Sequence, residues 1–274
     1  MKPILKYPGA KWKLSRWIIS NFPPHESYLE PYFGSGAVFF NKIPARIETI
    51  NDIDGAVVQF FKTCRDHPDD LARAIEMTPW ARDEFENAAL RAEADDVERA
   101  RQFAVRSWMS FGARLEVSRS WRHSTGARIN GGPDNPKLWN RCPDIVYEVA
   151  RRLKEAQIEN RPALDVITAH NGPAVLIYAD PPYLRSTRTL KGDQYRHEMT
   201  QSDHVDLLKA LKAHTGMVII SGYDNELYQD TLAGWKVLHQ ATVAERGVRR
   251  VEALWLNPAT TDALNERRVT KLDP

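Results

Sequence analysis

An aspartate, two prolines and a tyrosine at positions 180–183 directly follow the apolar residues 175–179. Proline has no amide hydrogen and a fixed φ angle, so this turn is stiff and its carbonyl oxygens remain free to accept hydrogen bonds. An exocyclic amine on a flat ring has two N–H donors, which Asp180 and the carbonyl of Pro181 could accept while Tyr183 stacks on the ring. The pattern predicts a site that turns an aromatic amine towards an electrophile, although a tight turn capping a buried strand would contain the same residues.

A second group of residues, nearer the N-terminus, is typical of a nucleotide-like binding site. A short apolar stretch leads into a turn with Gly34 and Gly36, which allow a ligand to approach the backbone closely, and residues 37–40 are compatible with a helix. The next expected strand, residues 46–50, is followed by Asp52. A carboxylate in this position commonly binds ribose hydroxyls. Two glycines are a weak fingerprint, and the turn could also be an ordinary one.

The elements that must position these residues alternate between strand-like and helix-like patterns, which predicts an α/β fold with a mostly parallel sheet flanked by helices. A mainly helical insert, residues 67–155, divides the sheet-forming domain into residues 1–66 and 156–274. Helices are expected at residues 12–21, 55–65, 83–91, 97–108 and 144–154, and strands near residues 28, 47, 157–159, 174, 217, 237 and 251.

Composition restricts the class of protein without selecting a function. The chain has 274 residues, of which 42% are hydrophobic and 27% charged, as in globular proteins with one substantial core. Its net charge is only +2, so a nucleic-acid-binding surface would require local clustering of cations. Cys64 and Cys142 are too few for a disulfide framework, and no Cys/His spacing indicates a metal site. No signal peptide or membrane-spanning run is present, which predicts a cytoplasmic protein.

The motifs together resemble those of the Dam-type (D12 class) DNA adenine N6-methyltransferases, which use S-adenosylmethionine. In that family an aspartate at the first position of the Asp-Pro-Pro-Tyr motif goes with adenine N6, so Asp180 favours adenine. The chain has Ala10 and Asp54 where glycine and asparagine are frequent. The resemblance implies a Rossmann-like sheet. The segments that resemble the family follow one another in the family's order: residues 6–11, 27–36, 51–54 and 180–183. Further similarity is found at residues 219–224 and 251–257.

The resemblance also implies the residues that perform the reaction, in which an adenine flipped out of duplex DNA receives the methyl group. No metal and no cysteine nucleophile is expected. The predicted catalytic residues are Asp180, Pro181, Pro182 and Tyr183. The positions that contact the cofactor in the family are Tyr7, Lys11, Glu30, Phe33, Gly34, Gly36, Asp52 and Asp165.

Some of these assignments have simpler alternatives. Asp165, expected at the adenine amino group of the cofactor, could instead be a charge in the first turn of a helix, and Lys11 could be a surface lysine. We expect His197 and His204 to have structural roles and not to act as bases.

Residues 110–141 are rich in glycine, serine, arginine and tryptophan, and this segment is too long for a passive connection. Arginine can neutralise phosphates or read guanine, and aromatic rings can stack on bases. Composition alone fits equally well a solvated loop whose tryptophans pack on the insert, but the resemblance favours DNA binding and makes the insert a target-recognition subdomain. A second basic stretch follows Tyr183 and is expected to contact DNA as well. The predicted DNA-binding residues of the two stretches are Arg114, Arg119, Trp121, Arg122, Arg128, Arg185 and Arg188.

The favoured function is therefore site-specific methylation of adenine N6 in double-stranded DNA, as in restriction–modification systems, without a membrane or an obligate protein partner. Two alternatives remain: a methyltransferase with an RNA target or another amine or amide target, and a catalytically degenerate DNA-binding protein. The intact motifs at residues 34–36 and 180–183 argue against the second.

Overall fold

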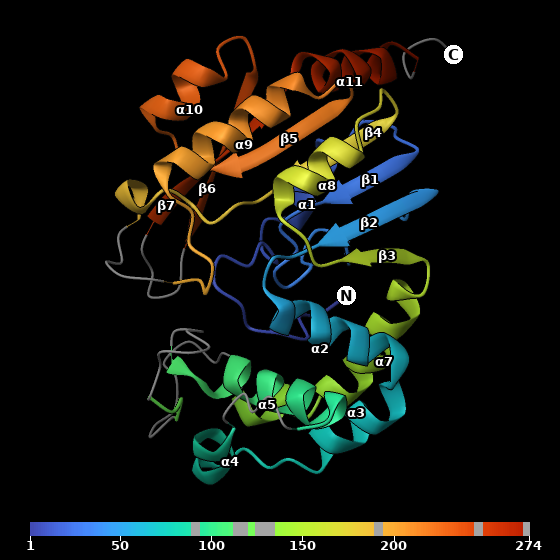
Figure 1. Ribbon diagram of the computed structural model, residues 1–274, viewed down its shortest axis with the longest axis vertical. Helices are drawn as coiled ribbons and strands as arrows, with labels where there is room; N and C mark the ends of the chain where they lie inside the picture. Colours follow the sequence, from blue (N-terminus) through green and yellow to red (C-terminus); the bar gives the residue numbers. More distant parts are fainter. Residues whose placement is uncertain (89–93, 112–119, 124–134, 189–193, 244–248, 271–274) are drawn as a thin grey trace.

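The computed structural model describes residues 1–88, 94–111, 120–123, 135–188, 194–243 and 249–270. Within these residues a seven-stranded sheet has the order β3-β2-β1-β4-β5-β7-β6 (Figure 1). Strands from β3 to β5 along this order are parallel, whereas β7 is antiparallel to β5 and β6. The expected mostly parallel sheet is confirmed. The strands are β1 (Ser27–Glu30), β2 (Ile47–Asn51), β3 (Ala156–Glu159), β4 (Val175–Ala179), β5 (Met217–Gly222), β6 (Lys236–Val243) and β7 (Arg249–Leu256).

The chain order in the sheet reverses between β1 and β4. From β1 the chain builds outward through β2 to β3, and it then returns to β4 and continues to β5 on the other side. In open parallel sheets, ligands bind outside the carboxyl ends of the strands at such a switch point. Because β1 ends at Glu30 and β4 ends one residue before Asp180, the sheet brings the two sequence motifs to the same edge.

Each face of the sheet has its own hydrophobic core, because successive side chains of a strand point to opposite faces. Leu176 and Tyr178 belong to one core, and Ile177 and Ala179 to the other. The core that contains Ile177 is covered by α8 (Ala163–Ala169), α9 (Gln201–Ala213) and α10 (Glu226–Thr231). Residues of α1 (Ser15–Ser20) and α11 (Pro258–Thr270) pack on the other core.

The expected helical insert lies beside the β3 edge of the sheet in Figure 1. Of its longest helices, α3 packs on α5 and on α7, and all three pack on α2 (Gly55–Asp66). α2 therefore packs on the insert although it precedes residue 67, where we expected the insert to begin. The helices of the insert are α3 (Pro68–Glu76), α4 (Arg82–Asn87), α5 (Asp96–Met109), α6 (Asn135–Trp139) and α7 (Cys142–Leu153).

The helix expected at residues 83–91 is shorter in the structure: α4 ends at Asn87 and Ala88 is not helical, while residues 89–91 lie outside the described part of the chain. Two other expected helices also differ. Residues 12–14 form turns, so that α1 begins only at Ser15, and residues 37–40 form turns instead of a helix. In the second case the rings of Phe33, Phe39 and Phe40 pack edge to face, and this packing prevails over local helix propensity. Among the described helices, none combines the length and hydropathy that a membrane span requires.

Helix starts near the switch point are fixed by side chains. The Asp54 carboxylate accepts a hydrogen bond from the amide of Ala56 at 3.0 Å and caps α2. Thr200 and Asp203 form a capping box at the start of α9, in which each side chain accepts from the other residue's backbone amide. These caps fix the positions of Asp54 and Asp203, which both border the cavity described below.

Candidate active site

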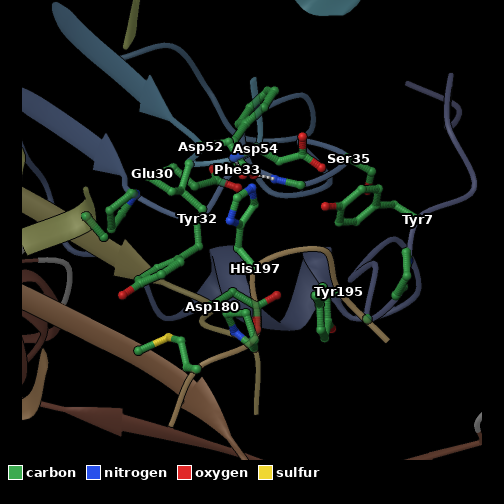
Figure 2. Close-up of a pocket in the computed structure, with 18 of the residues that line it drawn as sticks. Tyr7, Glu30, Tyr32, Phe33, Ser35, Asp52, Asp54, Asp180, Tyr195 and His197 are labelled. Carbon is green, nitrogen blue, oxygen red and sulfur yellow. Dashed lines mark hydrogen bonds between the residues drawn. The ribbon is translucent and has the colours of Figure 1, made fainter. Parts of the chain in front are cut away.

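A cavity of about 300 Å³ lies at the carboxyl ends of the parallel strands, at the switch point. Figure 2 shows its lining, with Asp52 and Asp54 on one side and Asp180 on the other. Of the residues predicted from the sequence to contact the cofactor, those in the lining are Tyr7, Lys11, Glu30, Phe33, Gly34 and Asp52. The structure therefore brings together residues of the N-terminal segment, the glycine turn and the tip of β2.

The glycine turn is held against the tip of β2 by the Asp52 carboxylate. One carboxylate oxygen accepts from the Gly34 amide at 2.8 Å, and the other accepts from the Asp54 amide at 2.9 Å. Burial raises the pKa of Asp52 to about 6, although these amide donors oppose the rise. The carboxylate is thus oriented before any ligand binds.

Gly36 supports the turn from behind and is not part of the lining. Its φ is +66°, and a Cβ atom there would overlap the rings of Phe40 and Phe33. The requirement for glycine at this position is therefore steric, which differs from the expected direct contact with a cofactor.

Glu30 ends β1 with its side chain buried in the lining. It accepts a hydrogen bond from the Tyr28 hydroxyl at 2.7 Å. Burial raises the pKa of Glu30 to about 8, the Tyr28 hydrogen bond opposes this, and the charge of Asp180 adds to it. Near neutral pH this carboxyl is mostly protonated, so it can donate as well as accept a hydrogen bond.

Only some residues of the Asp-Pro-Pro-Tyr turn line the cavity. Asp180 and Pro182 line the cavity, whereas Pro181 is buried and Tyr183 lies beneath the ammonium group of Lys11, 4.7 Å from its ring centroid. The Asp180 carboxylate accepts a hydrogen bond from the Ser221 hydroxyl at 2.7 Å. The contact of the Pro181 carbonyl with an amine stays a prediction.

Lys11 is not a surface residue. Its side chain is only 7% exposed, and its ammonium group lies 2.9 Å from Asp180 Oδ1 and 3.5 Å from Glu252 Oε1. Burial alone would lower the pKa of Lys11, but the two carboxylates outweigh burial and raise it well above its usual range. The lysine is therefore a cation in the immediate surroundings of Asp180.

Three residues around the Asp-Pro-Pro-Tyr turn were missed by sequence reasoning. Ser221 in β5 and Glu252 in β7 are buried polar residues within apolar strands, and the Tyr183 hydroxyl donates a hydrogen bond to Glu252. Tyr195 also lines the cavity. A polar residue on a buried strand requires a partner, so Ser221 and Glu252 had a signal that could have been followed.

Asp165 is placed away from the cavity. It lies in the first turn of α8 with a side chain that is 51% exposed, 3.7 Å from the guanidinium of Arg161. Its neighbours Ala163 and Leu164 do line the cavity. The position in the first turn of α8 agrees with the alternative, a helix N-terminal charge, and the expected contact of Asp165 with the cofactor stays a prediction.

The two histidines differ from each other. His204 is buried in α9 with Nδ1 2.9 Å from the Tyr228 hydroxyl, and burial lowers its pKa to about 4, as suits a structural side chain. His197, for which we expected the same role, is exposed and lines the cavity in Figure 2. The expected structural role is therefore wrong for His197, while the expectation that it does not act as a base stays a prediction.

The predicted DNA-binding residues of the insert fall into two groups. Trp121 and Arg122 pack within it: the Arg82 guanidinium covers the Trp121 ring, and Arg122 Nε donates to the Ser110 carbonyl at 3.1 Å. Likewise Trp139 is buried and donates to the Thr78 carbonyl at 2.7 Å. For these side chains the packing alternative holds. The remaining ones, Arg114, Arg119 and Arg128, lie outside the described residues.

The two arginines after Tyr183 also have different environments. Arg188 is only 6% exposed and is paired with Glu198 at 2.8 Å, because Glu198 needs a cation where it is buried. This pairing contradicts the expected phosphate contact of Arg188. Arg185 is exposed on a short 3₁₀ helix (Arg185–Thr187) close to the turn, as the prediction requires.

A mostly parallel sheet with a cavity at its switch point, between the Asp52 carboxylate and the Asp-Pro-Pro-Tyr turn, is the arrangement of a Rossmann-like ligand-binding domain. A family model described as D12 class N6 adenine-specific DNA methyltransferase matches residues 7–245. The chain belongs to this family, and it is a DNA methyltransferase specific for adenine N6. The alternatives of a different amine or amide target and of a non-catalytic DNA-binding protein are thereby set aside.

Individual relatives are distant but match over most of their length. The type II methyltransferase M1.LlaDCHI of Lactococcus lactis subsp. cremoris is 23% identical over 249 residues, 84% of this chain and 85% of the relative. The type II methyltransferase M.MjaIII of Methanocaldococcus jannaschii is 21% identical over 289 residues, 93% and 97% of the two chains. A solved structure of a putative methyltransferase from Escherichia coli superposes with a TM-score of 0.41 and 12% identity, covering 92% of this chain and 86% of that one.

Proposed function

We propose that the methyl donor is S-adenosylmethionine and that it binds between the tips of β1 and β2. It supplies an electrophilic methyl group on a sulfonium. Asp52 would accept the ribose hydroxyls, and its fixed orientation removes the entropic cost of ordering it. Ile53 and Leu164 are 41% and 37% exposed and line the cavity, so an adenine ring there would cover apolar surface.

The target in this proposal is an adenine flipped out of double-stranded DNA. The Asp180 carboxylate would accept a proton of the N6 amine, together with the Pro181 carbonyl, and the Tyr183 ring would stack on the base. Hydrogen bonding draws the amine towards tetrahedral geometry, which frees the nitrogen lone pair from conjugation and aligns it for in-line transfer. Pro182 keeps the turn rigid because its φ angle is fixed.

For DNA, we propose that residues 67–155 form the target-recognition subdomain and residues 1–66 and 156–274 the catalytic domain. Arg185, exposed beside the catalytic turn, supports a phosphate contact at the cavity mouth. The assignments of Arg114, Arg119 and Arg128 stay predictions. The type II relatives support a role as the modification enzyme of a restriction–modification system, which would act on cellular DNA in the cytoplasm.

One observation carries the proposal: Glu30, Asp52 and Asp180, from the ends of three parallel strands, line the same cavity. The test is to express the chain in a host without DNA methylation and to sequence the methylated positions. We expect N6-methyladenine at one short sequence motif, and none with Asp180→Ala. Methyl groups on cytosine alone, or none on DNA from cells with the folded parent protein, would contradict the proposal.

A further inference from the structure

The ammonium group of Lys11 lies where the proposed function requires the amine of the target base. It is 2.9 Å from Asp180 Oδ1 and donates to the Gly9 carbonyl at 2.9 Å. It also lies over the Tyr183 ring, 4.7 Å from the centroid, which is a favourable cation–π distance. A carboxylate, a carbonyl and an aromatic face are the three kinds of contact that we assign to an exocyclic amine and its ring.

These contacts leave little capacity for a second amine at the same place. Asp180 Oδ1 lies 2.9 Å from the Lys11 ammonium and accepts a hydrogen bond from the Ser221 hydroxyl at 2.7 Å, so two donor groups already surround this oxygen. The face of Tyr183 on the Lys11 side is covered by the ammonium, and the Tyr183 and Tyr223 rings make a T-shaped contact at a centroid distance of 4.8 Å. A base that stacks on this face of Tyr183 and bonds Asp180 Oδ1 must displace Lys11.

A buried ammonium cannot leave its partner without a second one, because an unpaired buried charge is strongly unfavourable. Glu252 supplies the second partner. Its carboxylate is 5% exposed, lies 3.5 Å from the Lys11 ammonium and already holds the Tyr183 hydroxyl. A short movement of Lys11 towards Glu252 would therefore keep the ammonium paired and release Asp180.

The segment that carries Lys11 is also joined to the helical insert. The backbone amide and carbonyl of Lys6 each bond the Ser107 hydroxyl of α5 at 2.8 Å, and Lys6 Nζ donates to Asn135 of α6 at 2.8 Å. Trp108 of α5 donates to the Ile4 carbonyl at 2.8 Å. If the insert moves when DNA binds, the movement would therefore be transmitted to Lys11 through residues 6–11.

We propose that Lys11 is an internal occupant of the target-amine site, which the flipped adenine displaces towards Glu252. Lys11 thereby keeps the site filled until a base enters, and Glu252 is a positioning residue that receives the displaced ammonium. The inference rests on the proposed contact of the target adenine with Asp180 and Tyr183, and it adds a step that precedes methyl transfer.

Two substitutions separate displacement from simple structural support. Glu252→Gln keeps an acceptor for the Tyr183 hydroxyl but removes the charge that receives Lys11. Lys11→Met combined with Glu252→Gln removes the occupant as well, and this double variant has the same net charge around Asp180 as the parent. The matched control is Lys13→Met with Glu226→Gln, two exposed residues outside the cavity.

The measurement is single-turnover methylation, at saturating cofactor, of a duplex that carries the motif found by methylation sequencing. We expect Glu252→Gln to slow methyl transfer about tenfold, because the base-accepting state is less populated. Its dissociation constant for S-adenosylmethionine, measured by calorimetry, should stay within about twofold of the parent's, since cofactor binding does not require Lys11 to move. The double variant should be faster than Glu252→Gln, and the control should match the parent.

A double variant that is as slow as Glu252→Gln, or slower, would overturn the inference, because Lys11 would then be needed in the reaction itself. An unchanged rate for Glu252→Gln would overturn it too. A crystal structure of the parent with S-adenosylhomocysteine and the duplex gives a second check: Lys11 on Glu252 supports displacement, and Lys11 still on Asp180 beside a stacked base contradicts it. A parent protein that does not methylate the duplex would instead contradict the proposed function.

Discussion

At the scale of single residues, the carboxyl groups of one cavity differ because their partners differ. Asp52 is held by two backbone amides, Asp180 by a hydroxyl and an ammonium, and Glu30 by a phenol. The raised pKa of about 8 makes Glu30 mostly neutral near pH 7, while Asp52, with a pKa of about 6, is mostly ionised. The two aspartates have separate roles in our proposal, since Asp52 accepts from the cofactor and Asp180 accepts from the target amine.

Replacing Asp180 should abolish methyl transfer while cofactor binding survives. Asp180→Ala removes the acceptor for the amine, and Asp180→Asn places an amide donor among Ser221, Lys11 and the target N–H. We expect either change to lower the rate about a hundredfold or more, as the loss of a group that acts on the transition state does. Transfer of labelled methyl groups to DNA measures the rate, and calorimetry with S-adenosylmethionine checks the site. Turnover equal to the parent's would remove Asp180 from the mechanism.

Replacing Asp52 should act on the cofactor instead. Asp52→Ala loses a charge-assisted hydrogen bond to ribose, which we expect to weaken S-adenosylmethionine binding by roughly 1.5–3 kcal/mol. Asp230→Ala, at an exposed site on α10, is the matched control. Calorimetry on both variants, with circular dichroism to verify folding, decides the point. If the folded Asp52 variant binds as tightly as the control, the ribose contact lies elsewhere.

At the scale of secondary-structure elements, the glycine turn after β1 and the segment after β4 both contribute residues to the lining of the cavity. The turn needs positive φ angles at Gly34 and Gly36, where only glycine is unstrained. The segment after β4 has a buried ion pair, Arg188 with Glu198, that fixes its path, and an exposed Arg185 beside the catalytic turn. Arg185 and Arg188 lie in the same basic stretch of the sequence, so the local charge did not indicate which of the two is buried.

Gly36→Ala should destabilise the protein through overlap in the turn. The added methyl group meets Phe33 and Phe40, and we expect a loss of about 1–3 kcal/mol from overpacking in addition to the strain of a positive φ angle. Gly234→Ala is the matched control, because its φ is +88° and no atom lies within 4 Å of the added Cβ. Urea unfolding of the two variants measures the difference. Equal losses would show that the overlap relaxes at no cost.

Arg185→Ala should weaken binding to all DNA sequences alike. A phosphate contact contributes about 0.9 to the slope of log K against log salt, so the variant should have a slope shallower by that amount. Arg46→Ala is the control, since Arg46 is exposed at the amino end of β2, on the edge of the sheet away from the cavity. Titrations of specific and scrambled duplexes at several salt concentrations give both slopes. An Arg185 variant with the slope of the Arg46 variant would remove this contact.

At the scale of the whole molecule, the order of the strands determines the site. The sheet places the ends of β1, β2 and β4 around one cavity, while β7 brings Glu252 within 3.5 Å of the Lys11 ammonium. The stability of this arrangement depends on pH, because the fold buries Glu30 in a position where its neutral form is favoured.

Glu30 should contribute less to the stability of the fold as pH rises from 4.5 to about 8. Folded Glu30, with a pKa of about 8, retains a proton that the unfolded chain releases above its ordinary value of 4.5. The unfolding free energy then falls by at most about 1.4 kcal/mol per pH unit in this window from Glu30. Glu30→Gln cannot ionise, so its stability should depend less on pH than the parent's. Chemical denaturation at several pH values tests this, and parallel curves for the two proteins would contradict the role of Glu30.

The sequence by itself determined the family, the α/β fold and the positions of Asp52 and Asp180, because short motifs with glycine, proline and carboxylate residues encode local geometry. Only the tertiary structure decided which side chains meet. Lys11 and Ser221 contact Asp180 from segments far apart in the sequence, and Glu252 contacts Lys11 from a third segment. Asp165 and Arg188 have other partners. Strand order and burial determine such contacts, and neither is a property of a short stretch of sequence.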